Sequence, residues 1–130
     1  MKDFLFKSPT KVKFGAGTSF QLYEIFEEMG VKKPFFVTGK HVGKTDEFAK
    51  IIASLEEKGY SVQLFTDTQP DPPIDVCDAA AQVLKDSGCD VCVAVGGGSV
   101  IDTAKAMCML ITNEGSVKEY LFGGSKTVEN

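Results

Sequence analysis

The clearest candidate for chemistry is the run Gly96-Gly97-Gly98-Ser99, which follows the apolar segment Val91–Val95 directly. Consecutive glycines allow unusual backbone angles and close approach of a ligand to the main chain. Their N–H groups, with the N-terminus of a following helix, form a site suited to phosphate. Ser99 adds a hydroxyl donor. We expect Asp102 in the first helical turn, where its carboxylate suits the helix dipole and can satisfy free N–H groups. The alternative is a tight turn with a capping aspartate that binds nothing, but three successive glycines favour phosphate binding.

Two further loops are expected at the same edge of the protein, because ligands of open parallel sheets bind beyond the carboxyl ends of the strands. The first spans residues 39–45 and contains Lys40, His41 and Lys44. The second spans residues 67–73 and contains Asp71. A lone histidine in a loop is more often solvent-exposed than a ligand, and Asp71 could equally serve turn formation.

The four cysteines are interpreted as structural. Cys89 and Cys92 form a C-x-x-C pair, but residues three apart on a strand point to opposite faces, so their thiols should diverge. No second Cys/His pair stands nearby to complete a zinc site. Cys77 and Cys108 lie in apolar surroundings, where a free cysteine behaves as a small hydrophobe.

The elements that must position these residues alternate along the chain. Short β-like segments at Phe4–Phe6 and Val12–Phe14 predict an N-terminal hairpin. Apolar spacing then predicts helices over residues 18–29, 46–58, 74–87 and 100–111, and strands over residues 34–38, 60–65 and 91–95. This order predicts an α/β fold with a mostly parallel sheet and helices on both faces. The uniformly apolar segment 91–95 is expected at the centre of that sheet.

Length and composition limit the remaining classes. A chain of 130 residues with 43% hydrophobic residues is the size of one globular domain. The net charge of −4, without a Lys/Arg cluster, argues against a nucleic-acid partner. No apolar run approaches the roughly 20 residues that cross a bilayer, and the N-terminal apolar stretch is short for a signal peptide. We therefore expect a cytoplasmic protein without a membrane partner.

Several of these segments together resemble one family. The segment Gly96–Lys105 (GGGSVIDTAK) is similar to the pyrophosphate-binding signature of the iron-containing (group III) alcohol dehydrogenases. Pro9–Gly17, Val37–Lys40 and Pro70–Pro72 resemble that family's N-terminal strand, second-strand exit and proline loop. Dehydroquinate synthases and glycerol dehydrogenases share the glycine signature, but the continuation after it favours the alcohol dehydrogenase branch. The resemblance implies a Rossmann-like (dehydroquinate synthase-like) fold.

The resemblance also implies two domains with separate roles, of which this chain contains one. Residues 1–130 would form the dinucleotide-binding domain of an oxidoreductase that interconverts small alcohols and aldehydes by hydride transfer. In the family, a separate helical domain holds Fe²⁺ or Zn²⁺ through one aspartate and three histidines, whereas this chain has one histidine, His41. We therefore expect the chain alone to be inactive. The alternatives are a stand-alone nucleotide-binding module without catalysis and a structural flavodoxin-like domain whose glycine turn binds nothing.

The cofactor and the oligomer follow from the same resemblance. Many family members carry an aspartate at the position of Gly39, where it binds the adenosine ribose and repels a 2′-phosphate. The absence of that charge, with Lys40 next to it, favours NADP over NAD. The resemblance places Asp71 near the adenosine, and pyrophosphate at Gly96, Gly97, Gly98 and Ser99 with Asp102 organising the loop. It also implies a homodimer formed through the N-terminal strands.

Overall fold

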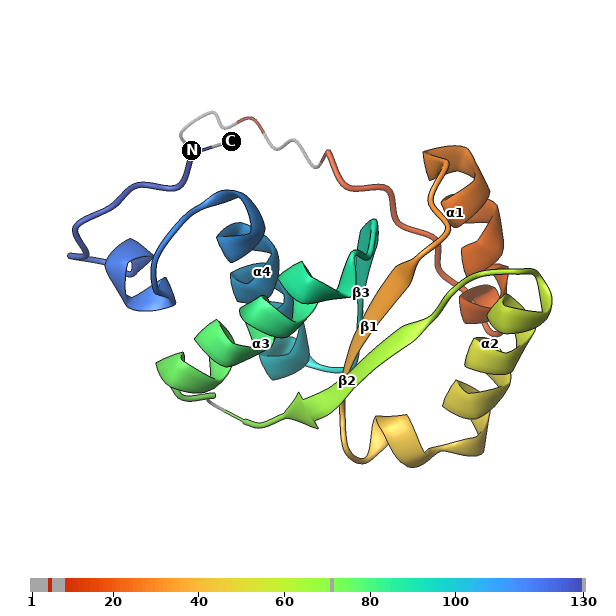
Figure 1. Ribbon diagram of the computed structural model, residues 1–130. Helices are drawn as coiled ribbons and strands as arrows, with labels where there is room; N and C mark the ends of the chain where they lie inside the picture. The colour runs from red at the N-terminus through yellow and green to blue at the C-terminus, as the bar shows by residue number, and fades with distance from the viewer. Residues whose placement is uncertain (1–4, 6–8, 71, 130) are drawn as a thin grey trace.

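The sheet is parallel and lies between two layers of helices. The computed structural model describes residues 5, 9–70 and 72–129. Its strands are β1 (Pro34–Gly39), β2 (Gln63–Thr68) and β3 (Val91–Val95), arranged in the order β2-β1-β3 (Figure 1). Both pairings are parallel, with Phe36 opposite Leu64 and Val93. The predicted α/β class with a parallel sheet is therefore confirmed.

The helices follow the predicted order. They are α1 (Leu22–Met29), α2 (Asp46–Glu57), α3 (Ile74–Ser87) and α4 (Gly98–Thr112), with 3₁₀ turns η1 (Thr18–Gln21), η2 (Val42–Lys44) and η3 (Val117–Tyr120). Helices α1 and α2 cover one face of the sheet, and α3 and α4 cover the other (Figure 1). Gly30 and Gly88 end α1 and α3 in the left-handed conformation that favours glycine. Within the described part of the chain, no helix is long and apolar enough to cross a membrane.

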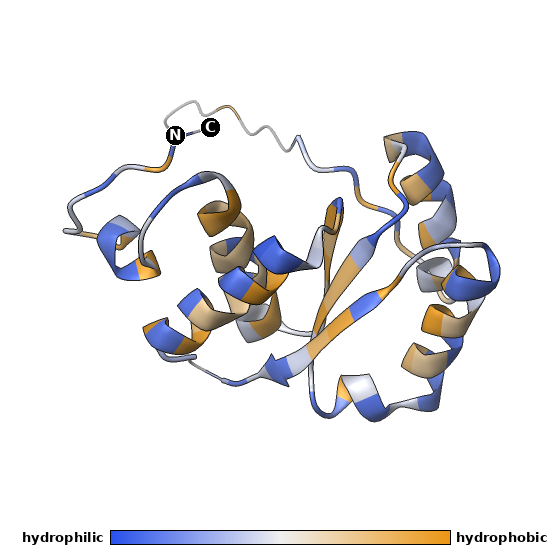
Figure 2. Ribbon diagram, in the orientation of Figure 1, coloured by the Kyte–Doolittle hydropathy of each residue, from blue (hydrophilic) through white to orange (hydrophobic). Residues whose placement is uncertain are grey.

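Alternation along β1 divides the core into two halves. Phe35 and Val37 pack against α3 and α4 with Met107, whereas Phe36 packs against α1 and α2 with Phe26. Figure 2 shows the corresponding hydrophobic residues along the strands and on the sheet-facing sides of the helices. The central strand is thereby held from both faces, so the positions at its carboxyl end are fixed.

Two predictions about the strands are wrong. β3 lies at the edge of the described sheet, and the buried central strand is β1. A uniformly apolar strand indicates that helices cover both of its faces, as they do for β3. It does not indicate whether other strands flank it on both sides. β2 begins at Gln63 rather than residue 60, because Tyr60 lies in the turn that closes α2. Its N–H donates to the Leu55 carbonyl oxygen and its ring contacts Phe26, with ring centroids 5.4 Å apart.

The predicted N-terminal hairpin is also not found. Val12–Phe14 is irregular, and Val12 and Phe14 are 83% and 98% exposed. Of the other predicted strand, Phe4–Phe6, only Leu5 is described, and it is 93% exposed and outside any strand. A strand is stabilised by a partner strand and a buried face, and residues 9–14 have neither within the described chain.

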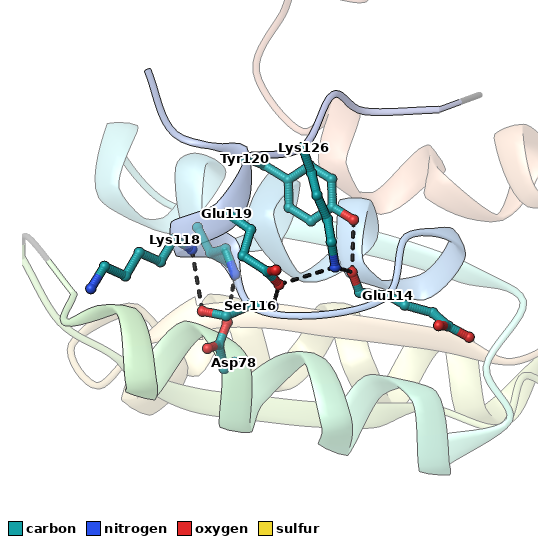
Figure 3. A network of polar contacts seen from close by, with 8 residues as sticks. Asp78, Glu114, Ser116, Lys118, Glu119, Tyr120 and Lys126 are labelled. Atoms are coloured by element: carbon teal, nitrogen blue, oxygen red, sulfur yellow. Dashed lines mark hydrogen bonds and ion pairs between the residues drawn. The ribbon is translucent and has the colours of Figure 1, made fainter. Parts of the chain in front are cut away.

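The segment after α4 is fastened to α3 by polar contacts (Figure 3). Asp78 on α3 accepts a hydrogen bond from the Val117 backbone N–H at 2.9 Å. Ser116 and Glu119 form a reciprocal capping box at η3. Hydrogen bonds from the Ser116 N–H and then Lys126 lower the pKa of the Glu119 carboxyl. These contacts fasten the segment to α3, so they support the fold.

Candidate nucleotide-binding site

The carboxyl ends of all three strands open into one cavity of about 560 Å³, a volume typical of small-molecule sites. It is lined from β1 and η2 by Gly39–Val42, from β2 by Thr68–Pro70, and from the glycine loop by Gly96–Val100. The structure therefore brings together six of the predicted site residues: Gly39, Lys40, Gly96, Gly97, Gly98 and Ser99. It also places His41 in the lining.

The three glycines of the loop have different surroundings. A Cβ on Gly96 would lie 2.7 Å from Val100 Cγ2, and its φ of +157° is one that other residues rarely adopt. The φ angle is positive at neither Gly97 nor Gly98. Apart from chain neighbours and the helix's own backbone, no atom of the described residues would lie within 4 Å of a Cβ on either. Folding therefore requires glycine at 96, whereas the space beside Gly97 and Gly98 is open to the cavity.

The N-terminus of α4 faces this open space. Gly97 is its N-cap residue and, being a glycine, supplies no side-chain cap; among the described residues no side chain accepts a hydrogen bond from the first turn. The first turn of any α-helix leaves N–H groups without intrahelical partners, and here Gly98 and Ser99 lie in that turn. Unpaired N–H groups at the positive end of a helix dipole, inside a cavity, are suited to bind a phosphate group.

The capping role predicted for Asp102 is wrong. Helix α4 begins at Gly98, two residues before the predicted start at Val100, so Asp102 is displaced beyond its first turn. Its carboxylate lies 3.6 Å from the Lys105 ammonium, with both side chains exposed, and it does not line the cavity. A contact between Asp102 and a cofactor stays a prediction.

Two threonines without a predicted role in the site tie the strand ends together. The Thr68 hydroxyl donates to the Thr38 carbonyl oxygen at 2.9 Å, and the Thr38 hydroxyl donates to the Val95 carbonyl oxygen at 2.7 Å. Thr38 is fully buried. This Thr68–Thr38–Val95 relay of two hydrogen bonds links β2 to β1 and β1 to β3. It therefore holds together the carboxyl edge of the sheet, which the glycine loop follows. Its signal in the sequence is a polar residue closing the apolar run Pro34–Val37.

A charged pair lies at the β1–β2 side of the site. The Lys40 ammonium lies 3.4 Å from an Asp67 carboxylate oxygen, and both side chains are about 70% exposed. A Cβ on Gly39 would approach nothing closer than the Thr68 carbonyl oxygen at 3.9 Å, so there is room for a side chain. Lys44 lies in η2 and does not line the cavity. Asp71 lies outside the described residues.

The cysteines lie away from this site. Cys89 and Cys92 do not diverge as predicted: both pack against the α3–α4 half of the core and line a second cavity with Cys108. Strand alternation does not apply to Cys89, because it precedes β3. The hydrogen bond between the Cys92 and Cys108 thiols lowers the pKa of Cys108 to about 7 and, with burial, raises that of Cys92. Among residues 9–70 and 72–129, no group of three His, Cys, Asp or Glu side chains could hold a metal ion.

A phosphate-type loop at the carboxyl edge of a parallel sheet, entering an uncapped helix, is the arrangement of a nucleotide-binding α/β domain. The chain belongs to the iron-containing alcohol dehydrogenase family, whose family model matches residues 9–130. The family resemblance seen in the sequence is thereby confirmed.

Individual relatives agree with this assignment. The chain is 38% identical over 130 residues to a choline dehydrogenase of Bacillus subtilis, covering 99% of this chain and 32% of the relative. It is 33% identical to long-chain-alcohol dehydrogenase 1 of Geobacillus thermodenitrificans, covering 88% and 29%. The chain thus spans about a third of the length of these curated relatives.

Solved structures match the fold closely. The NADH-dependent butanol dehydrogenase A of Thermotoga maritima superposes with a TM-score of 0.87 at 29% identity, covering 99% of this chain and 32% of that one. A sulfoacetaldehyde reductase of Bifidobacterium kashiwanohense, solved in complex with NAD⁺, superposes with a TM-score of 0.83 at 29% identity, covering 92% and 31%. The first of these enzymes is thus NADH-dependent, and the second was solved with NAD⁺ bound.

Proposed function

We propose that residues 1–130 form the dinucleotide-binding part of a metal-dependent alcohol dehydrogenase. The observation that carries this proposal is the uncapped N-terminus of α4, with open space beside Gly97 and Gly98, inside the cavity at the strand ends. Fold and family support the same reading. Because the chain spans about a third of the length of its relatives, the alcohol or aldehyde substrate and the catalytic step are part of this proposal.

Each group at the cavity has a definable task. The N–H groups of Gly98 and Ser99 bind the pyrophosphate, and the Ser99 hydroxyl adds a donor. The Thr38 relay keeps the strand ends in register beneath it. The bound nicotinamide supplies the hydride-accepting carbon. The described residues include no group of side chains that could hold a catalytic Fe²⁺ or Zn²⁺ ion. We expect residues 1–130 alone not to oxidise alcohols.

The residues at the ribose side favour NADP over NAD, although NAD is the second candidate. Gly39 places no negative charge at the end of β1 and leaves room for a 2′-phosphate. The Lys40 ammonium is exposed and beside the cavity, where it can meet that phosphate. A cation near a phosphate lowers its electrostatic energy even where water screens it.

The N-terminal segment supports a homodimer. Val12 and Phe14 are almost fully exposed and lie in a segment without a partner strand among the described residues. Exposed apolar segments of this kind invite pairing with a second chain. Sedimentation of the chain with and without Phe14→Ser tests the proposal: the substitution is expected to shift the dimer toward the monomer.

The main experiment measures thermal stability of the chain with NADP⁺, with NAD⁺ and without ligand. A ligand that binds only the folded state stabilises it by RT ln(1 + [L]/Kd), about 2.7 kcal/mol at 100 times Kd. We expect a rise with both nucleotides and a larger one with NADP⁺. A rise confined to NAD⁺ would remove the preference but keep the site. The absence of any rise would contradict nucleotide binding by this chain.

A further inference from the structure

The pairing of β1 and β2 changes register beside the site. Val37 lies opposite Phe65, but Gly39 lies opposite Thr68, so β2 has one more residue than β1 over this stretch. Thr66 and Asp67 are the residues between those two registers. An extra residue of this kind bends its strand and redirects side chains, and such irregularities often adjoin functional sites. Here it accompanies the contact between the Asp67 carboxylate and the Lys40 ammonium.

That contact is easily separated. The two groups are 3.4 Å apart, and each side chain is about 70% exposed. Exposed ion pairs contribute little to stability, because water screens the attraction and long side chains lose freedom in forming them. A ligand that offers either group a better partner can therefore divide the pair at little cost. Lys40 lines the cavity and Asp67 directly precedes Thr68, which also lines it.

Resting on the dinucleotide site proposed above, we propose that Asp67 is a specificity-determining residue that opposes Lys40 in the choice between a ribose hydroxyl and a ribose 2′-phosphate. A free ribose offers hydroxyl donors to the Asp67 carboxylate and leaves Lys40 paired. A 2′-phosphate brings about −1.5 to −2 charges, which attract Lys40 and are repelled by Asp67. The pair thus makes the site accept both nucleotides and sets the ratio of their affinities.

The experiment compares NADP⁺ and NAD⁺ affinities by isothermal titration calorimetry for the chain, for Asp67→Asn and for Lys40→Met. Asp67→Asn should raise the ratio of NADP⁺ to NAD⁺ affinity by about tenfold, and Lys40→Met should lower it by a similar factor. Both shifts should shrink as salt rises from about 0.05 to 0.5 M, because the groups are exposed. Asp86→Asn is the matched control: it makes the same charge change at the far end of α3 and should leave the ratio unchanged.

The outcomes separate this proposal from the one on which it rests. If the unsubstituted chain binds both nucleotides and Asp67→Asn leaves the ratio within twofold, the role of Asp67 is refuted while the site stands. If Asp86→Asn shifts the ratio as much as Asp67→Asn, the effect is one of net charge and the specific role is refuted. If the unsubstituted chain binds neither nucleotide, both proposals fail.

Discussion

The substitution Gly97→Ala tests whether glycine at this position is needed for folding or for binding. In the chain without ligand, the added Cβ would have no atom within 4 Å, and the φ of −87° at Gly97 suits any residue. Gly97→Ala should therefore change the free energy of unfolding by no more than about 0.5 kcal/mol, as at an unstrained surface position. Gly96→Ala is the contrast, because its Cβ would lie 2.7 Å from Val100 Cγ2. Overpacking of that size costs about 1–3 kcal/mol.

The effect of Gly97→Ala on binding should be large. Gly97 lines the cavity, so a methyl group there would compete for space with a phosphate bound, as proposed, at the first N–H groups of α4. Hydrogen bonds to a charged group contribute roughly 1.5–3 kcal/mol each, and losing one corresponds to a weakening of about 10- to 150-fold. We expect the Kd for the dinucleotide to rise by at least tenfold.

Two assays on the same preparations decide the matter: urea unfolding monitored by circular dichroism, and titration calorimetry with NADP⁺. The expected pattern is an unchanged unfolding midpoint with weakened binding for Gly97→Ala, and a lowered midpoint for Gly96→Ala. An unchanged Kd for a stably folded Gly97→Ala would refute the assignment of this loop to phosphate. A lowered unfolding midpoint for Gly97→Ala would instead refute the claim that folding does not need glycine there.

Three further predictions concern other parts of the molecule. Gly39→Asp should be accommodated, since its Cβ would have ordinary contacts, and should weaken NADP⁺ binding by about tenfold in calorimetry while NAD⁺ binding is kept; equal losses for both nucleotides would contradict the charge argument. Thr38→Val should lower the free energy of unfolding by about 1–2 kcal/mol in urea, because it leaves the Val95 carbonyl oxygen without its donor; no loss would show that the relay does not hold the strand ends. Alkylation of Cys108 by iodoacetamide, followed by mass spectrometry, should rise with pH through about 7, since the thiolate is the reactive form, and Cys92→Ala should move that midpoint toward about 8.5; a midpoint unmoved by Cys92→Ala would contradict the thiol hydrogen bond.

The sequence was sufficient to predict most elements because their signals are local. Gly30 and Gly88 end helices where the apolar spacing ends, and α3 has the predicted bounds of residues 74–87. The cavity-lining residues of the loops were also predictable, since carboxyl ends of parallel strands meet at one edge. These inferences need only chain order and the geometry of a parallel sheet.

What the sequence could not predict depends on contacts between distant residues. The order of the strands across the sheet is one such feature: β3 lies at the edge, although its residues are as apolar as those of a central strand. The Lys40–Asp67 contact and the Thr68–Thr38–Val95 relay join residues about 27 to 57 positions apart. No periodicity within a strand or helix records such pairs, so the part of the site that depends on them appears only in three dimensions.

The start of α4 gives the strongest argument for function. Glycine in a helix is less favourable than alanine by about 1 kcal/mol, and Gly98 lies within the first turn. Folding does not demand that cost, because a Cβ at Gly97 or Gly98 would meet no atom within 4 Å. Gly96, by contrast, is explained by the contact that its Cβ would make with Val100. Gly98 therefore keeps space open against the preference of the helix, and Gly97, the N-cap residue, adds to that space. A ligand that approaches the first N–H groups of α4 explains why the space is kept.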